Sequence, residues 1–392
     1  MAIDPLALRA DVLILGGGIA GLWTLAVLRD QGFDAWLLDT ALPGGEQTLA
    51  SQGIIHGGAK YALTGHLTRS AREIAAMPAI WRARLAGEGA PDLSSLGLLA
   101  DHQYLWSTRQ FGSRLAGFFA DKIMQERMHR VDRPPEALDT PGFDGQVYRL
   151  DEPVLDVPRL QQLLLRQTAG RVIAPLRLDA LDNTARQLHG EWRGRMLRFD
   201  FEQVILAAGK GNGALREMLG LAANMQLRPL NMVMTRGPLP ALHAHCLGVS
   251  ANPRLTITSY PLADGETLWY LGGQLAEEGV GLSDATQIEN AREALAELLP
   301  WIDQKALRWA CWPVDRAEVA NQGRRPDHPT LLRDGDIHTL WPTKLAFAPL
   351  LADHLLRAIR DAGIQPRPEA AGDFSAPPTA RAATPWERVT WC

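Results

Sequence analysis

Three glycines near the start of the chain limit what it can fold into. Gly16, Gly18 and Gly21 have the spacing G-x-G-x-x-G and directly follow a run of apolar residues at 12–15, which is typical of a buried strand. Apolar residues then recur with helical spacing as far as Gly32, and glycine commonly ends a helix. This order predicts a buried strand, a tight turn and a helix.

The same residues fit a nucleotide pyrophosphate. Gly16 permits a tight turn from strand to helix, Gly18 lets the backbone approach the pyrophosphate, and Gly21 lets the helix pack closely against the strand. The N–H groups at the start of the helix attract phosphate. A second apolar run at 35–38 ends at Asp39, whose carboxylate can accept hydrogen bonds from ribose hydroxyls. We therefore predict a dinucleotide site on an α/β fold.

The composition is that of a globular protein. A length of 392 residues suggests two domains, and 46% hydrophobic with 21% charged residues is ordinary for a folded chain. A net charge of -4 without a basic block disfavours nucleic-acid binding. The three cysteines form no C-x-x-C pair, so we predict no disulfide framework, no metal site and a cytoplasmic location. The uncharged stretch 12–28 contains the glycine turn, so we predict no membrane-spanning segment.

A segment in the middle of the chain adds to the nucleotide site. The apolar run at 204–207 predicts a buried strand that ends in Ala208 and Gly209. Small residues at that end of a strand let a cofactor lie against the backbone. Three short strands joined by tight turns are predicted before it, at 172–181, 187–192 and 196–201.

A segment near the far end completes the pattern. A strand up to Leu340 turns at Pro342, and a helix is predicted at 346–362 with Pro349 in its first turn. The start of this helix, with Lys344 beside it, can face a developing negative charge. Reduced flavin carries such a charge at its pyrimidine edge.

These three signals, in this order, resemble those of the FAD-dependent D-amino-acid-oxidase superfamily. It includes glycine and sarcosine oxidases, glycerol-3-phosphate dehydrogenase and 2-hydroxyglutarate dehydrogenase. Segment 51–61, S-Q-G-I-I-H-G-G-A-K-Y, is similar to S-x-x-I-H-G-G-x-R-Y of the glycerol-3-phosphate dehydrogenase branch and to S-G-V-I-H-x-G of the hydroxyglutarate branch. Lys60 stands where the first branch has arginine. The turn at 342–345 resembles the G-G-K-x-T of that branch, with both glycines absent. The resemblance covers about residues 10–360.

The resemblance implies FAD as the cofactor and an α/β fold in two parts. One is a Rossmann-like FAD-binding domain of glutathione-reductase type, and the other is an α+β substrate domain built on an antiparallel sheet. The implied ranges are 9–85, 150–232 and 305–363 for the FAD-binding domain, and 86–149 and 233–304 for the substrate domain. Residues 364–392 are rich in proline and alanine, which predicts an extended or disordered tail. The cofactor-binding residues are Gly16, Gly18, Gly21, Asp39, Ser51, Gln52, Ala208, Gly209, Lys344 and Leu345.

The substrate domain carries its own local signals. Strands are predicted at 255–260 and 268–272, joined by a turn at Asp264 and Gly265. Thr286 and Glu289 have the spacing of a capping box, which predicts a helix that runs to Leu299.

Two arginines compete to bind the substrate. Amine and hydroxyacid oxidases of this superfamily often hold a carboxylate with an arginine in a G-x-R-P segment, which Arg325 matches at 323–326. The segment 309–313 could instead align with the strand that carries this arginine, and Arg316 is then the candidate. The sequence leaves both open.

His56 is the histidine that the motif places near the flavin. It could orient the substrate, take a proton as hydride leaves, or carry a covalent flavin link. Tyr61, Tyr260 and Tyr270 are weaker pocket candidates, and core packing is an alternative for each.

The predicted function is FAD-dependent oxidation of a C–H next to an amine or hydroxyl in a small, anionic substrate. Hydride passes to flavin N5, and oxygen or a quinone-linked molecule is the final electron acceptor. The alternative is a flavin-binding assembly subunit or maturation factor without turnover. Peripheral membrane attachment and oligomerisation stay open.

Overall fold

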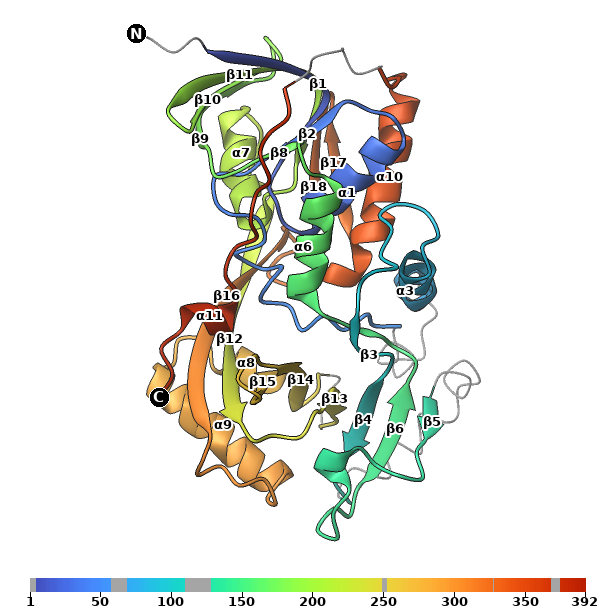
Figure 1. Ribbon diagram of the computed structural model, residues 1–392, viewed down its shortest axis with the longest axis vertical. Helices are drawn as coiled ribbons and strands as arrows, with labels where there is room; N and C mark the ends of the chain where they lie inside the picture. Colours follow the sequence, from blue (N-terminus) through green and yellow to red (C-terminus); the bar gives the residue numbers. More distant parts are fainter. Residues whose placement is uncertain (1–4, 58–68, 110–127, 249–251, 327, 368–373) are drawn as a thin grey trace.

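A computed structural model describes residues 5–57, 69–109, 128–248, 252–326, 328–367 and 374–392. Two eight-stranded β-sheets organise this part of the chain, and they lie towards opposite ends of its long axis (Figure 1). Segments far apart in the sequence contribute to each sheet. The chain is therefore a mixed α/β protein, as predicted.

The first sheet is built around the strand that precedes the glycine turn. Strand β1 (Leu6–Leu15) pairs in parallel with both β2 (Ala35–Leu38) and β11 (Arg195–Leu206). The order of the sheet is β17 (Thr330–Asp334), β18 (Ile337–Trp341), β11, β1, β2 and β8 (Val172–Ile173), with β10 (Gln187–Trp192) and β9 (Arg177–Asp182) paired beyond β11.

From residue 10 onward, strand β1 is buried on both faces, which explains its continuous apolar run. Val12 and Ile14 pack into the helical side of the sheet, and Leu13 and Leu15 pack into the other side. The helices of the first cluster are α1 (Ile19–Asp30), α3 (Arg69–Leu85), α6 (Val157–Gln167) and α10 (Ala348–Asp361). The expected helix from Gly18 to Gly32 is confirmed, since Gly18 is its N-cap and Gly32 follows with a φ of 82°.

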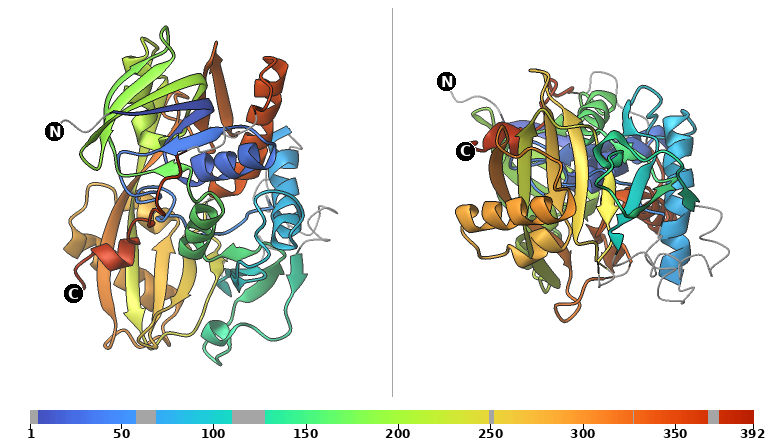
Figure 2. Two further views of the ribbon diagram at one scale, coloured as in Figure 1. Left: turned by 45° about the horizontal axis from the view of Figure 1, so that its top comes forward. Right: turned by 90° about the horizontal axis from the view of Figure 1, so that it is seen from below.

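The second sheet is antiparallel except at one pair. Its order is β16 (Arg308–Val319), β12 (Met225–Gly237), β15 (Thr267–Gly272), β14 (Leu255–Pro261), β13 (Ala244–Cys246), β4 (Gln103–Ser107), β6 (Gln146–Leu150) and β5 (Met128–Arg130). Strands β13 and β4 are parallel. Helix α9 (Asp284–Leu298) packs against this sheet (Figure 2).

The remaining elements are short. They are β3 (Leu98–Ala100), β7 (Val154–Leu155), α7 (Asn212–Met218), α8 (Gln274–Glu278), α11 (Pro385–Arg388), and the 3-10 turns Glu136–Leu138, Gly209–Gly211 and Leu345–Phe347. Helix α10 begins after the last of these turns, with proline at its start as expected.

Three local predictions are wrong in detail. Helix α9 begins earlier than predicted, because the Ser283 hydroxyl accepts a hydrogen bond from the Thr286 N–H at 3.2 Å. Thr286 is therefore the third helical residue and not the cap. The strands predicted at 196–201 and 204–209 are one strand that ends at Leu206, and the strand predicted at 172–181 is two.

Sheet membership differs from the predicted domain boundaries in two places. Strand β12 crosses the boundary predicted at residue 232, and β16 lies within the range 305–363 that we assigned to the FAD-binding part. The two strands pair with each other over their whole lengths, so both belong to the second sheet. The division into domains otherwise stays a prediction.

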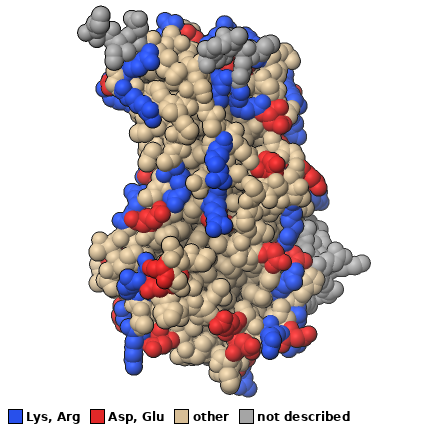
Figure 3. Space-filling model, viewed as in Figure 1, with Lys and Arg blue, Asp and Glu red and all other residues tan. Residues whose placement is uncertain are grey.

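Residues 374–392, called the strap below, run from the first sheet to the second (Figure 1). The strap is mostly extended, and it contains α11. On the face shown in Figure 3, charged residues of both signs are interspersed. Among the described residues, no helix is long and apolar enough to cross a membrane.

Candidate functional site

A cavity of about 870 Å³ is lined by residues from both sheets and the strap. All but one of the predicted cofactor residues line it, and so do His56, Arg316 and Arg325. The exception is Gly21, which lies in the first turn of α1. Lys60 and Tyr61 lie outside the described residues.

The glycine turn is fixed by close backbone contacts. Gly16 has a φ of +114°, and a Cβ atom there would lie 2.5 Å from Cα of Ala208 at the end of β11. A Cβ atom on Gly21 would lie 1.9 Å from the carbonyl oxygen of Gly16. Gly18 is less confined, because a Cβ atom there would lie 3.1 Å from Thr48 Oγ1. Gly16 and Gly21 are therefore required by the fold itself, and Gly18 leaves room beside the cavity.

Asp39 closes the turn from the end of β2. Its carboxylate accepts hydrogen bonds from the N–H groups of Gly17 at 2.6 Å and Ala41 at 3.1 Å. Burial raises the pKa of Asp39, although these hydrogen bonds oppose the shift. The carboxylate thus organises the turn as well as lining the cavity.

Two residues that sequence reasoning missed also hold the glycine turn. The hydroxyl of Thr48 accepts a hydrogen bond from the Ile19 N–H at 2.9 Å. The side chain of Gln161, on α6, donates to the carbonyl of Gly17 at 2.8 Å. Neither residue belongs to a recognisable motif, so no signal in the sequence marked them.

The described residues fit a dinucleotide such as FAD. The first turn of α1 carries no acidic residue that would repel a phosphate. Ser51 Oγ and Trp341 Nε1 are buried, line the cavity and have no hydrogen-bond partner among the described residues. Buried polar atoms are normally paired, so both indicate a polar ligand.

The side chain of Gln52 has a second role. Its amide donates to the carbonyl of Tyr270 at 2.9 Å and accepts from the Thr256 hydroxyl at 2.7 Å. It therefore connects the loop that follows β2 to the second sheet. Tyr260 and Tyr270 are 4% and 0% exposed and do not line the cavity, which places both in the core.

Lys344 and Leu345 line the cavity at the turn before α10. The Lys344 ammonium lies 5.5 Å from the centre of the Phe347 ring. Thr343 has a φ of +58°, a conformation that glycine adopts more easily. The chain therefore keeps a tight turn here without the two glycines of the related branch.

His56 lies beside a buried carboxylate. Its Nδ1 is 3.5 Å from Oε2 of Glu152, and its ring centre is 5.3 Å from that of His245. Glu152 is 5% exposed, and its oxygens accept hydrogen bonds from the Gly57 N–H and from the side-chain amide of Gln103. The sequence drew attention to His56 but not to Glu152, which lies far along the chain.

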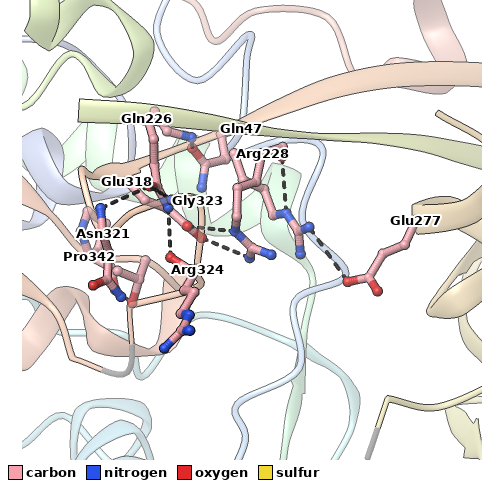
Figure 4. A network of polar contacts seen from close by, with 12 residues as sticks. Gln47, Gln226, Arg228, Glu277, Glu318, Asn321, Gly323, Arg324 and Pro342 are labelled. Carbon is pink, nitrogen blue, oxygen red and sulfur yellow. Dashed lines mark hydrogen bonds and ion pairs between the residues drawn. The ribbon is translucent and has the colours of Figure 1, made fainter. Parts of the chain in front are cut away.

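The two candidate arginines line the same cavity. Arg316 is the register partner of Arg228 on the neighbouring strand, and Arg228 forms a bidentate pair with the fully buried Glu318 at 2.7 and 3.0 Å (Figure 4). The Arg316 guanidinium lies 3.6 Å from Glu277, beyond normal hydrogen-bond length. Burial, together with Arg228 and Arg325, lowers the pKa of Arg316 to about 10.

Arg325 has no ionic partner among the described residues. Its Nε–H is buried and donates to no described residue, and Arg325 lines the same cavity as Arg316. Its neighbour Arg324 is exposed and does not line the cavity. The structure thus brings Arg316 and Arg325 together, whereas the sequence had set them as alternatives.

Comparison with known proteins places the chain in a family. Residues 11–333 match the model of the FAD dependent oxidoreductase family. A probable FAD-dependent oxidoreductase of Pseudomonas aeruginosa is 45% identical over 392 residues, which cover 98% of this chain and 99% of the relative. The crystal structure of an FAD dependent oxidoreductase from Pseudomonas aeruginosa has a TM-score of 0.83 at 40% identity, covering 98% of this chain and 99% of that one.

More distant structures share the fold alone. Glycine oxidase from Geobacillus kaustophilus has a TM-score of 0.64 at 18% identity, covering 93% of this chain and 96% of that one. An L-alpha-glycerophosphate oxidase from Mycoplasma pneumoniae has a TM-score of 0.62 at 13% identity, covering 95% and 97%. The chain belongs to the FAD-dependent oxidoreductase family of the D-amino-acid-oxidase superfamily, and it is a flavoprotein that uses FAD.

Proposed function

We propose that this chain oxidises a C–H bond next to an amine or hydroxyl in a small anionic substrate. When bound, FAD supplies the acceptor for the hydride, at N5. One observation carries the proposal: His56, Arg316 and Arg325 line the same cavity as the glycine turn. The final electron acceptor is oxygen or a quinone-linked molecule.

The arginines support an anionic substrate. A free carboxylate is costly to bury without a partner, and a guanidinium can bind it through two parallel hydrogen bonds. Arg228 is already paired with Glu318, so its charge is offset. Arg316 and Arg325 have hydrogen-bonding capacity left for a ligand among the described residues. We propose Arg325 as the main anchor and Arg316 as its neighbour in the same subsite.

We propose that His56 takes the proton of the substrate amine or hydroxyl, with Glu152 as its positioning residue. A carboxylate beside one ring nitrogen favours the tautomer in which that nitrogen carries the proton, and the other nitrogen is then basic. Glu152 is itself held by Gly57 and Gln103, so its orientation is fixed.

Glu152→Gln is expected to slow flavin reduction by about 10- to 100-fold, part of the 10²–10⁴ that a general base contributes. The amide keeps the size of the side chain but loses its charge, so FAD content and KM should change little. The rate of flavin reduction is measured by stopped flow, with whichever compound of the substrate panel described below reduces the flavin. Asp151→Asn is the matched control, because Asp151 is half-exposed and pairs with Arg149 on the surface. Equal rates in both variants would contradict the proposed role of Glu152.

We propose that Lys344 stabilises the negative charge of reduced flavin. Lys344→Met should lower the two-electron reduction potential by about 30 mV, which corresponds to roughly 1.4 kcal/mol. FAD affinity should stay nearly unchanged, because the glycine turn is intact. Spectroscopic titration against a reference dye measures the potential, and Lys305→Met is the control, since Lys305 does not line the cavity. An unchanged potential would place Lys344 away from the ring.

The proposed reaction is tested by anaerobic mixing with amino acids, 2-hydroxy acids and glycerol 3-phosphate. Bleaching of the visible flavin band by one of these is the expected result. The alternative, an assembly subunit or maturation factor, predicts that none of them reduces the flavin. We further propose that the FAD-binding part is of glutathione-reductase type and that the protein is cytoplasmic.

A further inference from the structure

The strap is anchored at its start on the first sheet. Phe374 stacks on Trp36, with ring centres 6.0 Å apart and planes at 17°. The Ala376 N–H donates to the carbonyl of Gly170 at 2.9 Å. These contacts fix the strap beside strands β2 and β8 (Figure 1).

The far end of the strap is anchored on the second sheet. The ring of Trp386 lies 4.6 Å from that of Tyr260 and 6.3 Å from that of Tyr270. Cys392 exchanges two backbone hydrogen bonds with Trp309, at 2.8 and 3.0 Å. A capping box at Thr384, which is 1% exposed, starts α11, the helix that carries Trp386. The strap is therefore held on both sheets.

The middle of the strap forms part of the cavity wall. Ala382, Ala383 and Arg388 line the cavity. The Ala382 N–H donates to the carbonyl of Pro43 at 2.9 Å, and the Arg388 guanidinium donates to the carbonyl of Gly45 at 3.0 Å.

These two hydrogen bonds hold the loop at 43–48, most of which also lines the cavity. The loop ends at Thr48, whose hydroxyl accepts from the Ile19 N–H at the start of α1. Contacts therefore run without a break from the strap, through the loop, to the glycine turn. Arg388 also lies over the Trp312 ring at 4.7 Å, which fixes its side chain on the second sheet.

We infer that residues 374–392 are part of the FAD-binding site: the docked strap forms one wall of the cavity, holds the loop at 43–48, and controls how long FAD is retained. The strap must undock, at least at 382–388, for FAD to leave by this side. Docking and FAD binding stabilise each other, and such coupling is reciprocal by thermodynamic necessity.

The first experiment loosens the strap at its aromatic anchor. Trp386→Ala, in the FAD-loaded protein, should speed FAD release about tenfold, within the usual range of coupling between sites. The protein is diluted into FAD-free buffer at constant temperature, and the rise in flavin fluorescence gives the rate of release. Trp301→Ala is the matched control, because Trp301 is a partly buried tryptophan that packs on Phe143 and does not line the cavity. A variant with residues 374–392 deleted should release FAD at least as fast as Trp386→Ala.

The second experiment uses the unaltered chain and measures how bound FAD changes the docking of the strap. Trypsin cleavage at Arg381 and Arg388 should be about tenfold slower in the FAD-loaded protein than in the FAD-free protein, as reciprocity requires. Mass spectrometry of the released C-terminal peptides measures both rates, and cleavage at the exposed Arg130 on β5, the edge strand of the second sheet, is the internal reference. The inference is overturned if FAD release is equal in Trp386→Ala and Trp301→Ala, or if FAD leaves cleavage of the strap unchanged. Neither readout depends on the substrate or on turnover.

Discussion

Replacing Gly16 by valine is expected to yield a protein without bound FAD and with a melting temperature lower by about 5 °C or more. A Cβ atom at this position would lie 2.5 Å from Cα of Ala208 and 2.6 Å from the carbonyl oxygen of Ala207. Both are backbone atoms at the end of the central strand β11, so neither can move aside cheaply. The φ of +114° adds strain for any residue with a side chain. The visible spectrum of the purified protein and a thermal melt measure the two effects.

Two further glycine variants separate an effect on folding from an effect on FAD binding. Gly18→Val should fold with a nearly normal melting temperature and still lack FAD, because its Cβ atom would meet only Thr48 Oγ1, at 3.1 Å. Gly97→Ala is the control, since a Cβ atom there meets only the end of the Arg159 side chain, at 3.5 Å, and Gly97 does not line the cavity. A yellow Gly16→Val or Gly18→Val protein would contradict the assigned pyrophosphate site.

Arg325→Met is expected to raise the substrate concentration for half-maximal flavin reduction at least about 30-fold. Truncating one partner of a buried hydrogen-bonded charge pair costs about 2–5 kcal/mol. Arg325→Lys should recover only part of the loss, because an ammonium cannot form the two parallel bonds of a guanidinium. Arg316→Met should have a smaller effect, since Arg316 Nε donates to the carbonyl of Arg228 and the residue is partly committed to the sheet.

The control for these variants is Arg324→Met, which changes the same charge at an exposed position outside the cavity. The measurement is the substrate dependence of anaerobic flavin reduction. If Arg325→Met, Arg325→Lys and Arg316→Met all leave the apparent affinity unchanged, the substrate is neutral or is held elsewhere. The proposal of an acidic substrate is then wrong.

The nucleotide end of the cavity was predictable because its signals are local. A glycine spacing, an apolar run and an acid at the end of the next strand lie within residues 12–39, and the structure has each element there. The fingerprint of a dinucleotide-binding βαβ unit is carried by residues that lie close together in the chain. The sequence therefore predicted where the glycine turn lies, and Gly16 and Gly18 of its motif line the cavity whereas Gly21 does not.

The other parts of the site depend on contacts between distant residues. Gln161 reaches Gly17 across 144 positions, and Glu152 reaches Gly57 across 95. A single sequence carries no mark of such pairs. The sequence left the choice between Arg316 and Arg325 open for a related reason, because one lies on β16 and the other in the loop that follows. Only the fold shows that both reach one cavity.

The composition of the strap predicts its conformation but not the contacts that anchor it. Its proline and alanine content predicts an extended arm, and it is extended, but the partners of Trp386 are two tyrosines on strands of the second sheet. Aromatic packing of this kind is specific in space and leaves no periodic pattern in the sequence.

Trp341 gives the chain a built-in optical reporter. Its ring is buried at the end of β18, it lines the cavity, and its Nε1 atom has no hydrogen-bond partner among the described residues. Flavins absorb light in the range where tryptophan emits, so an excited indole at the cavity wall transfers its energy to a flavin held beside it. Ultraviolet emission should therefore dim as the cavity fills and recover as it empties, and Trp341→Phe should reduce that change.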